Sequence, residues 1–363
     1  MGRIAFIGAV IVIIVLFAGF AAMTWVHFMG LAGMGWWLVP LLLVGGFVLG
    51  TLISFRFQHP LLRSFIGVSA IFLGFMNYGL LAAAACWILA GATRLAGLPV
   101  EPQLLAGTLY GAAVLATVYG LANAARIRVT RVAVSLPNLP ASWRGRTVAL
   151  VSDVHLGNIR GSAFVRRIVA RLREFRPNAV FISGDMFDGT QLDIDEAVRP
   201  WAGLSTPEGI FFAGGNHDDF GDRPKYLAAL ERVGLRVLNN EKVTVDGLQI
   251  AGVHDAEAGD PSRFREILRG MDLDRSVASI LLAHQPSHLA IPEAAGVSLQ
   301  LSGHTHSGQF WPWSLLVSRI YGPFAYGLNR LGGLLVYTSS GVGTWGPPIR
   351  VGTRSEIVVM RLQ

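Results

Sequence analysis

Four long hydrophobic runs without a charged residue fill most of the first third of the chain. A helix of about 20 residues crosses about 30 Å of hydrocarbon, and a helix satisfies its own backbone polar groups there. The first run also fits a cleaved signal peptide weakly, but three further spans favour a retained helix. The pattern therefore predicts an all-α transmembrane region of four helices over residues 1–125, with spans at 4–26, 36–55, 65–90 and 104–125.

After this region, short apolar segments alternate with amphipathic helices, as is typical of an α/β protein. Residues 126–145 are expected to form a connector with one strand, and residues 146–363 a globular domain. Polar residues directly follow several of the expected strands, where open α/β sheets build their sites. The strands that matter most are expected at residues 147–152, 179–183, 209–213, 248–253, 279–283 and 297–301.

Composition supports a division into a strongly hydrophobic N-terminal part and a globular part of ordinary composition. The chain has 52% hydrophobic and 15% charged residues and a mean hydropathy of +0.49, whereas an average soluble chain is about 25% charged. These values exclude a disordered or coiled-coil protein. The single cysteine, Cys86, excludes an internal disulfide framework. The first 125 residues contain five charged side chains, namely Arg3, Arg56, Arg63, Arg94 and Glu101.

The net charge of +7 comes from arginines scattered along the chain. They form no basic stripe interleaved with aromatic residues, so no nucleic-acid duplex is expected as a partner. The expected partner is a lipid bilayer, that of a bacterial inner or cell membrane. Under the positive-inside rule, the globular domain and both termini should lie in the cytoplasm. The arginines that set this orientation are Arg3, Arg56, Arg63, Arg126, Arg128 and Arg131.

Histidines and carboxylates gather in five short turns, most of them rich in glycine. Nitrogen and oxygen ligands of this kind suit Mn, Fe, Zn or Mg. Seven ligands are too many for one zinc ion but suffice for two divalent ions about 3.5–4 Å apart that share a carboxylate. The turns read Asp153-x-His155, Gly184-Asp185-x-x-Asp188, Gly215-Asn216-His217-Asp218, Ala283-His284 and Gly303-His304-x-His306.

These five motifs, in this order, resemble the calcineurin-like metallophosphoesterase superfamily. The segments Gly303–Gly308 and Ser340–Arg350 are similar to its membrane-associated YkuE- and YaeI-like branch. The hydrophobic N-terminal region is similar to transmembrane proteins that carry such a domain. The resemblance covers roughly residues 146–363. It implies a four-layer αββα sandwich, in which two mixed sheets are flanked by helices.

The resemblance also implies a role for each motif residue. Two divalent ions would be held by seven ligands: Asp153, His155 and His306 on the first ion, Asn216, His284 and His304 on the second, and Asp185 between them. Hydroxide bridging the two ions would attack the phosphorus atom. His217 would face the leaving group, and Asp188 would orient it. An unperturbed histidine pKa of about 6.5 suits that proton transfer.

Two further features have two interpretations each. His254 lies in a turn that imitates the Asn216 turn, and it either contacts a phosphate of the substrate or lies on the rim of the site. The aromatic segment 309–334 begins three residues after His306. It forms either a buried core loop or a flap in the headgroup region, in which case Trp311 and Trp313 would contact a lipid-linked substrate.

The sequence thus predicts a membrane-anchored, metal-dependent phosphoric ester hydrolase. The expected substrate is a phosphodiester or pyrophosphate, lipid-linked in the manner of a UDP-diacylated sugar. One alternative is a general or cyclic-nucleotide phosphodiesterase that the spans merely anchor. Another is a membrane sensor that binds phosphorylated ligands without turnover. No oligomeric state is predicted.

Overall fold

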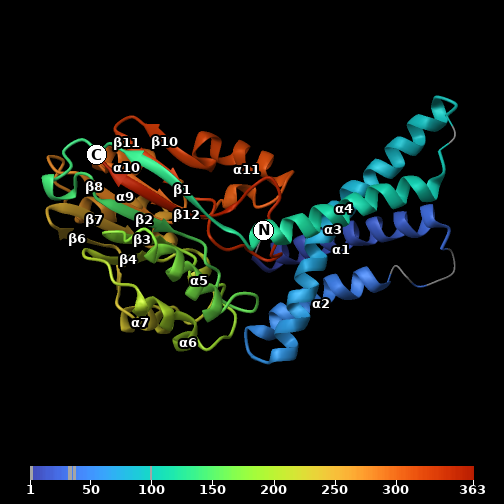
Figure 1. Ribbon diagram of the computed structural model, residues 1–363, viewed down its shortest axis with the longest axis horizontal. Helices are drawn as coiled ribbons and strands as arrows, with labels where there is room; N and C mark the ends of the chain where they lie inside the picture. The colour runs from blue at the N-terminus through green and yellow to red at the C-terminus, as the bar shows by residue number, and fades with distance from the viewer. Residues whose placement is uncertain (1–2, 32–34, 36–37, 99) are drawn as a thin grey trace. The chain divides into compact units, whose positions relative to one another are not determined.

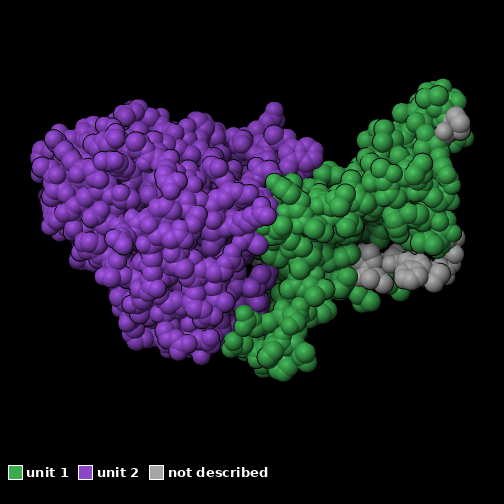
Figure 2. Space-filling view, in the orientation of Figure 1, with its two compact units in different colours: residues 1–122, 346–351 green, residues 123–345, 352–363 purple. Residues whose placement is uncertain are grey.

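The computed structural model describes residues 3–31, 35, 38–98 and 100–363, and it divides into two compact units (Figures 1 and 2). The helical unit consists of residues 1–122 and 346–351. The globular unit consists of residues 123–345 and 352–363. The short segment 346–351, expected within the C-terminal domain, therefore groups with the N-terminal helices.

The helical unit contains α1 (Arg3–Met29), α2 (Leu38–Ser54), α3 (Pro60–Leu95) and α4 (Pro102–Ala124). Among the described residues, three helices are long and apolar enough to cross a membrane, namely α1, α3 and α4. The 17 residues of α2 are apolar but fewer. Because residues 36 and 37 of the expected second span lie outside the described residues, a four-span arrangement stays a prediction.

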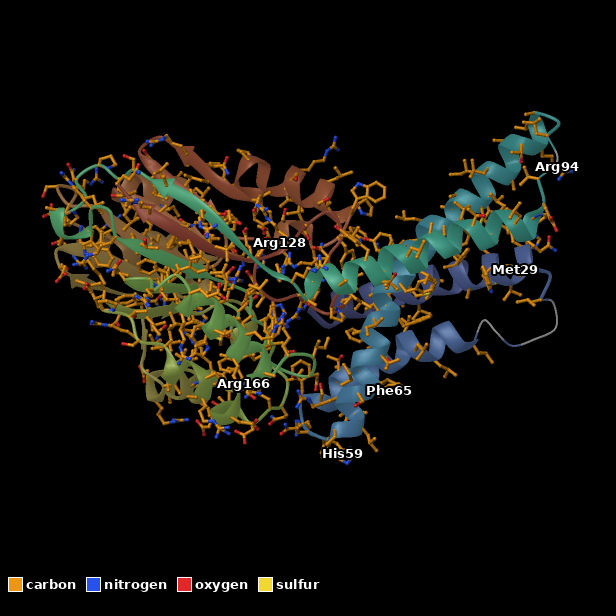
Figure 3. All side chains as sticks on the ribbon, in the orientation of Figure 1. Met29, His59, Phe65, Arg94, Arg128 and Arg166 are labelled. Atoms are coloured by element: carbon orange, nitrogen blue, oxygen red, sulfur yellow. The ribbon has the colours of Figure 1, made fainter. Side chains whose placement is uncertain are left out.

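Helix α3 is longer than the expected span because both of its ends have favourable capping. At its N-terminus, the Nδ1 atom of the cap residue His59 accepts a hydrogen bond from the Leu61 N–H, and Pro60 occupies the first turn. His59 and Arg94 mark the two ends of this helix (Figure 3). Arg94 lies in the last turn, where a positive charge complements the helix dipole.

The segment 346–351 packs against glycines of α3 and α4 inside the helical unit. The Arg350 N–H donates a hydrogen bond of 3.0 Å to the Gly120 carbonyl. A Cβ atom added to Gly74 would lie 2.7 Å from Cδ1 of Ile349, and one added to Gly120 would lie 3.2 Å from Ile349 Cβ. Both helices therefore approach the segment at positions that lack a side chain.

The globular unit contains two mixed sheets of six strands. In the first sheet all neighbouring strands are parallel except one internal antiparallel pair, the second and third strands of the order given below. In the second sheet the central strands run parallel and the pair at each edge is antiparallel. The first sheet has the order β1 (Ile127–Val134), β12 (Ser355–Leu362), β2 (Thr147–Val151), β3 (Ala179–Ser183), β4 (Gly209–Ala213) and β5 (Leu235–Val237). The second has the order β10 (Gly327–Leu331), β11 (Leu334–Thr338), β9 (Leu299–Ser302), β8 (Ser279–Ala283), β7 (Leu248–Val253) and β6 (Glu241–Val245).

The two sheets pack face to face, and helices cover their outer faces, which confirms the expected four-layer αββα sandwich. A fully buried core lies between the sheets and includes Leu150, Phe181 and Leu282. A second core joins the first sheet to α5 (Ser162–Arg173), α6 (Ile194–Val198) and α7 (Arg223–Arg232). A third joins the second sheet to α9 (Pro261–Gly270) and α10 (Ala290–Ala295).

Some edge strands differ from the sequence-based expectation. Strand β1, expected in a connector, pairs in parallel with β12 along its whole length, from Ile127 opposite Ser355 to Val134 opposite Leu362. Strands β5, β6 and β10 were not expected. They are short or half-exposed edge strands, so they lack the continuous apolar run that marks a central strand.

Candidate metal centre

The five predicted turns leave the carboxyl ends of parallel strands in both sheets. They follow β2, β3 and β4 of the first sheet and β8 and β9 of the second. Non-glycine residues rarely adopt a positive φ, and such strain concentrates at functional sites. Five of the predicted ligands do so, with φ of 55° at Asp153, 52° at His155, 53° at Asp185, 68° at His304 and 47° at His306.

One group of ligand atoms is formed by Asp153, His155 and His306. The Nε2 atom of His306 lies 3.4 Å from Asp153 Oδ1 and 3.1 Å from Nε2 of His155. Burial raises the pKa of Asp153 to about 6 and lowers the pKa of His155 well below its usual range. The carboxyl group of Asp153 therefore ionises only above about pH 6, while the imidazole of His155 stays neutral.

A second group surrounds His284 and Asp185. The Nδ1 atom of His284 lies 2.8 Å from the Ser183 carbonyl, which directs Nε2 toward the site. That Nε2 atom is 3.1 Å from Oδ2 of Asp185 and 3.9 Å from Oδ1 of Asp153. Burial opposes ionisation of both partners, but their mutual attraction raises the pKa of His284 and lowers the pKa of Asp185.

Asn216 and His304 extend this second group. Nδ1 of His304 lies 3.0 Å from Oδ1 of Asn216, and its ring centre is 5.2 Å from that of His284. Burial lowers the pKa of His304 to about 3, so its imidazole stays neutral and free to bind a metal. The carboxylate of Asp185 also lies 3.7 Å from Nε2 of His155, so it faces both groups.

These residues fit divalent metal ions. Three overlapping sets of ligand atoms, each within 4.8 Å of one another, include Asp153, His155, Asp185, His217, His284 and His306. Oδ2 of Asp153 is buried without a hydrogen-bond partner in the described part of the chain, and Nε2 of His284 faces the carboxylates of Asp185 and Asp153. Buried polar atoms are normally satisfied, so Oδ2 of Asp153 requires a partner such as a cation. The assignment of each ligand to one of two ions stays a prediction.

His217 lies beside the predicted ligands, with its ring roughly perpendicular to that of His155. Its ring meets that of His155 edge-on at 4.9 Å, and its backbone N–H donates to Oδ1 of Asp185 at 2.9 Å. Burial lowers its pKa. Nδ1 of His217 is buried and has no hydrogen-bond partner among the described residues. Asp188 accepts hydrogen bonds from the N–H and hydroxyl of Thr190, and its role in orienting His217 stays a prediction.

Asp218 has a structural role that the sequence reasoning did not assign. Its buried carboxylate accepts backbone N–H hydrogen bonds from Gly215 at 2.8 Å and from Asp185 and Phe187 at 3.0 Å. It thereby ties the turn after β3 to the turn after β4. An Asp that bonds the backbone of its own turn is a recognised turn signal, but the bonds across to the neighbouring turn depend on the fold.

Two exposed aromatic side chains flank His217 and were also missed. Phe220 is 54% exposed with its ring 4.6 Å from that of His217, and Trp345 is 61% exposed with its ring 5.9 Å away. Gln309 fixes Trp345 by accepting from its N–H and donating to its carbonyl. The side of the site that faces His217 is therefore apolar.

Arg160 places a buried positive charge near the same ligands. Its guanidinium donates 2.6 Å to the Thr344 hydroxyl, packs over the Phe164 ring, and contributes to lowering the pKa of His155. A guanidinium beside a metal site is suited to binding phosphate oxygens. No spacing in the sequence marks this residue, because its partner Thr344 is remote along the chain.

The remaining candidate residues, Trp311, Trp313 and His254, differ in their exposure to solvent. Residues 313–321 form α11 (Trp313–Tyr321), which has no buried residue, so the interpretation of the whole segment as a buried core loop is wrong. Trp311 and Trp313 are 50% and 44% exposed. His254, in contrast, is 1% exposed at the start of α8 (Asp255–Ala258), behind Gly214. Its contact with a phosphate stays a prediction.

Comparison with known proteins agrees with this geometry. A family model described as calcineurin-like phosphoesterase matches residues 146–308. A transmembrane protein with metallophosphoesterase domain from Danio rerio is 36% identical over 68% of this chain and 59% of its own length. An uncharacterized metallophosphoesterase from Aquifex aeolicus is 30% identical over 69% of this chain and 97% of its own length. An uncharacterized metallophosphoesterase from Bacillus subtilis, YkuE, is 28% identical over 62% of this chain and 82% of its own length.

A four-layer sandwich with histidines and aspartates at its strand ends defines a class of metal-binding α/β domains. Within that class, this chain belongs to the calcineurin-like metallophosphoesterase family. Its relatives include transmembrane proteins, in keeping with the three apolar helices. The chain spans about three fifths of the length of the Danio rerio protein.

Proposed function

We propose that the protein is a membrane-anchored phosphoesterase that uses two divalent ions, drawn from Mn, Fe, Zn or Mg. The observation that supports this most is the position of Asp185, whose carboxylate lies 3.1 Å from Nε2 of His284 and 3.7 Å from Nε2 of His155. A carboxylate between two groups of ligands suits a bridge between two ions. Such ions would neutralise phosphoryl charge and lower the pKa of water toward about 7, supplying hydroxide as the attacking group.

The chain's own residues carry the rest of the proposed mechanism. Asp153 and Asp185 hold the ligand groups in place, and the Arg160 guanidinium binds a non-bridging phosphate oxygen. His217 stands beside the site and, once protonated, donates a proton to the leaving alkoxide. Burial lowers its pKa, so the protonated form is a minor fraction at neutral pH and gives up its proton readily. Phe220 and Trp345 exclude water from the leaving-group side.

The proposed substrate is a lipid-linked phosphodiester or pyrophosphate, of which a UDP-diacylated sugar is one example. Support comes from the apolar rim formed by Phe220 and Trp345 and from the exposed side chains of Trp311 and Trp313. A phosphoester dissolved in water would gain little from such a rim. In this proposal the globular unit faces the cytoplasm, as the arginines at the span ends favour.

The enzymatic part is tested by metal-dependent hydrolysis of bis(p-nitrophenyl) phosphate by the full chain in detergent. Asp185→Asn preserves the side-chain shape but removes the charge between the two ligand groups. We expect it to lower activity by about 100-fold or more. Asp195→Asn, at an exposed ion pair with Arg232, is the matched control and should retain activity. Equal activity of Asp185→Asn and wild type would exclude the proposed site.

The substrate class needs a separate comparison. Phosphomonoesters, cyclic nucleotides, soluble pyrophosphates and a lipid-linked pyrophosphate in mixed micelles are offered to the same metal-loaded protein. The proposal expects the highest kcat/KM for the lipid-linked compound. A preference for a cyclic nucleotide would instead favour a general phosphodiesterase that is merely anchored by its helices.

A further inference from the structure

The exposed apolar side chains of the globular unit gather in one region. All residues of this unit are described, and five of its eight large exposed hydrophobic side chains lie between residues 311 and 320. Two of the others are Phe220 and Trp345 beside His217. A soluble surface seldom collects apolar residues in this way unless another phase or partner covers it. The five are Trp311, Trp313, Leu315, Leu316 and Ile320.

Helix α11 presents four of these side chains, Trp313, Leu315, Leu316 and Ile320, as one face. With 3.6 residues per turn, its exposed apolar residues and Arg319 share an arc of about 160°. Leu315 is 60% exposed, Leu316 50% and Ile320 64%. A short apolar face with tryptophan at one end and an arginine within it is typical of helices that lie in the plane of a bilayer surface. The arginine stem can stay in the apolar layer while its charge reaches lipid phosphates.

The start of α11 lies beside the point where the last apolar helix enters the globular unit. The last two residues of α4, Asn123 and Ala124, belong to this unit. The Asn123 side chain donates 2.9 Å to the Thr353 carbonyl, and the Thr353 hydroxyl donates to the Gln309 carbonyl. Next to Thr353, a Cβ atom on Gly352 would lie 3.7 Å from Cβ of Trp311. The segment that begins at Gln309 and includes Trp311 is therefore linked to Asn123, near the end of α4, through Gly352 and Thr353.

The other end of α11 reaches the metal centre. The Tyr321 ring lies 6.3 Å from the ring of His304, one of the predicted ligands. The Thr305 hydroxyl, next to His304, donates 2.8 Å to the Ala325 carbonyl and so fastens the segment that follows the helix. One nine-residue helix thus connects the end of the span with the ligand cluster.

We infer that α11 is an interfacial helix whose exposed face lies in the headgroup layer of the bilayer that holds the spans. The position of α11 is independent of the proposed function. Its consequence, that the site takes its phosphoester from the membrane surface, rests on that function. Leu316 and Ile320 insert among acyl chains, and Arg319 contacts anionic headgroups. The occupant of the face is thus a lipid surface.

The position of the helix is tested without any enzymatic readout. The full chain with Cys86→Ala receives a nitroxide at Leu316→Cys or, as the control, at Glu266→Cys on the exposed side of α9. Both proteins are reconstituted in nanodiscs of phosphatidylethanolamine and phosphatidylglycerol. We expect the Leu316 label to collide with oxygen more often than with a water-soluble nickel chelate, and the Glu266 label to show the reverse. Equal collision with the nickel chelate at both sites would overturn the inference, as would spin coupling between copies of the chain.

The consequence for the substrate is tested by a ratio of activities. The double variant Leu316→Gln, Ile320→Gln removes the apolar face, whereas Ser318→Gln, at an exposed polar position of the same helix, is the matched control. We expect the double variant to lower the ratio of lipid-linked to soluble diester hydrolysis by about tenfold and the control to leave it unchanged. An unchanged ratio in the double variant contradicts the inference while leaving phosphoesterase activity intact. A wild-type protein inactive on both substrates contradicts the proposed function, while the nitroxide result still decides the position of α11.

Discussion

At the scale of single residues, two turns that carry predicted metal ligands are joined by a side chain that is not itself a predicted ligand. Asp218 accepts three buried backbone N–H groups, including that of Asp185, whose φ of 53° is strained. Asp218→Ala leaves those N–H groups without an acceptor, so we expect it to lower the free energy of unfolding by about 1–3 kcal/mol. It should also weaken metal binding.

Chemical denaturation with and without Mn²⁺ measures both effects of that change. Asp218→Asn is the informative partner variant because its amide oxygen still accepts hydrogen bonds from part of the set. We expect its stability to lie between those of wild type and Asp218→Ala. An alanine variant with wild-type stability and wild-type metal affinity would show that the two turns hold their shape without this carboxylate.

Asp153 makes metal binding depend on pH. In the metal-free protein, burial raises its pKa to about 6, so the carboxyl group keeps its proton below that pH. A metal ion requires the carboxylate, and binding in acid must therefore release a proton. His304, with a pKa lowered to about 3, stays neutral throughout. We expect the apparent Mn²⁺ affinity to fall by about tenfold per pH unit below pH 6.

Calorimetric titration with Mn²⁺ at about pH 5 and about pH 7, in buffers of different ionisation enthalpy, measures the affinity and the protons released. The sign follows from the raised pKa of Asp153, because its protonation competes with the metal in acid. The pKa of His284 is also raised, so its proton is released on metal binding at both pH values. An affinity that is constant across this range, with no proton release, would contradict the prediction.

At the scale of elements, sequence patterns foretell the parts of this fold that are locally determined. Strands β2, β3, β4 and β8 are continuous apolar runs that end in ligand-bearing turns, so both the strands and the turns can be read directly. Strand β1 depends on pairing with β12 near the chain end, and its half-exposed pattern carries little local signal. Long-range pairing is what local periodicity cannot supply.

The candidate site also has a part that could be predicted from the sequence and a part that could not. Its ligands follow strands and glycines, so their approximate meeting place could be predicted. The rim could not, because Phe220 and Trp345 lie 125 residues apart in the sequence and meet only around His217. Arg160 and Thr344 are similarly remote from each other. Residues that act through side-chain packing across loops leave no fixed spacing in a single sequence.

At the scale of the whole molecule, one short stretch of chain belongs to both units. The Val342 N–H donates 2.9 Å to the Ser152 carbonyl, and the Gly343 N–H donates 2.8 Å to that of Asp153. Three residues later the chain enters the helical unit, where Ile349 packs on Gly74 of α3. The backbone that supports a predicted metal ligand is therefore anchored at its far end among apolar helices.

This continuity predicts that a substitution in α3 changes the metal centre. Gly74→Leu places a side chain where a Cβ atom alone would already lie 2.7 Å from Ile349 and 3.2 Å from Pro347. Displacing residues 346–351 should pull on Gly343 and Val342, so we expect a severalfold loss of metal-dependent diester hydrolysis and weaker Mn²⁺ binding. Gly67→Leu is the matched control, since a Cβ atom at Gly67 meets nothing within 4 Å. Both variants are compared with wild type in the same nanodiscs, by activity and by metal titration. If Gly74→Leu and Gly67→Leu behave alike, the stretch from Gly341 to Val351 tolerates movement at one end without transmitting it, and the helices act as an anchor alone.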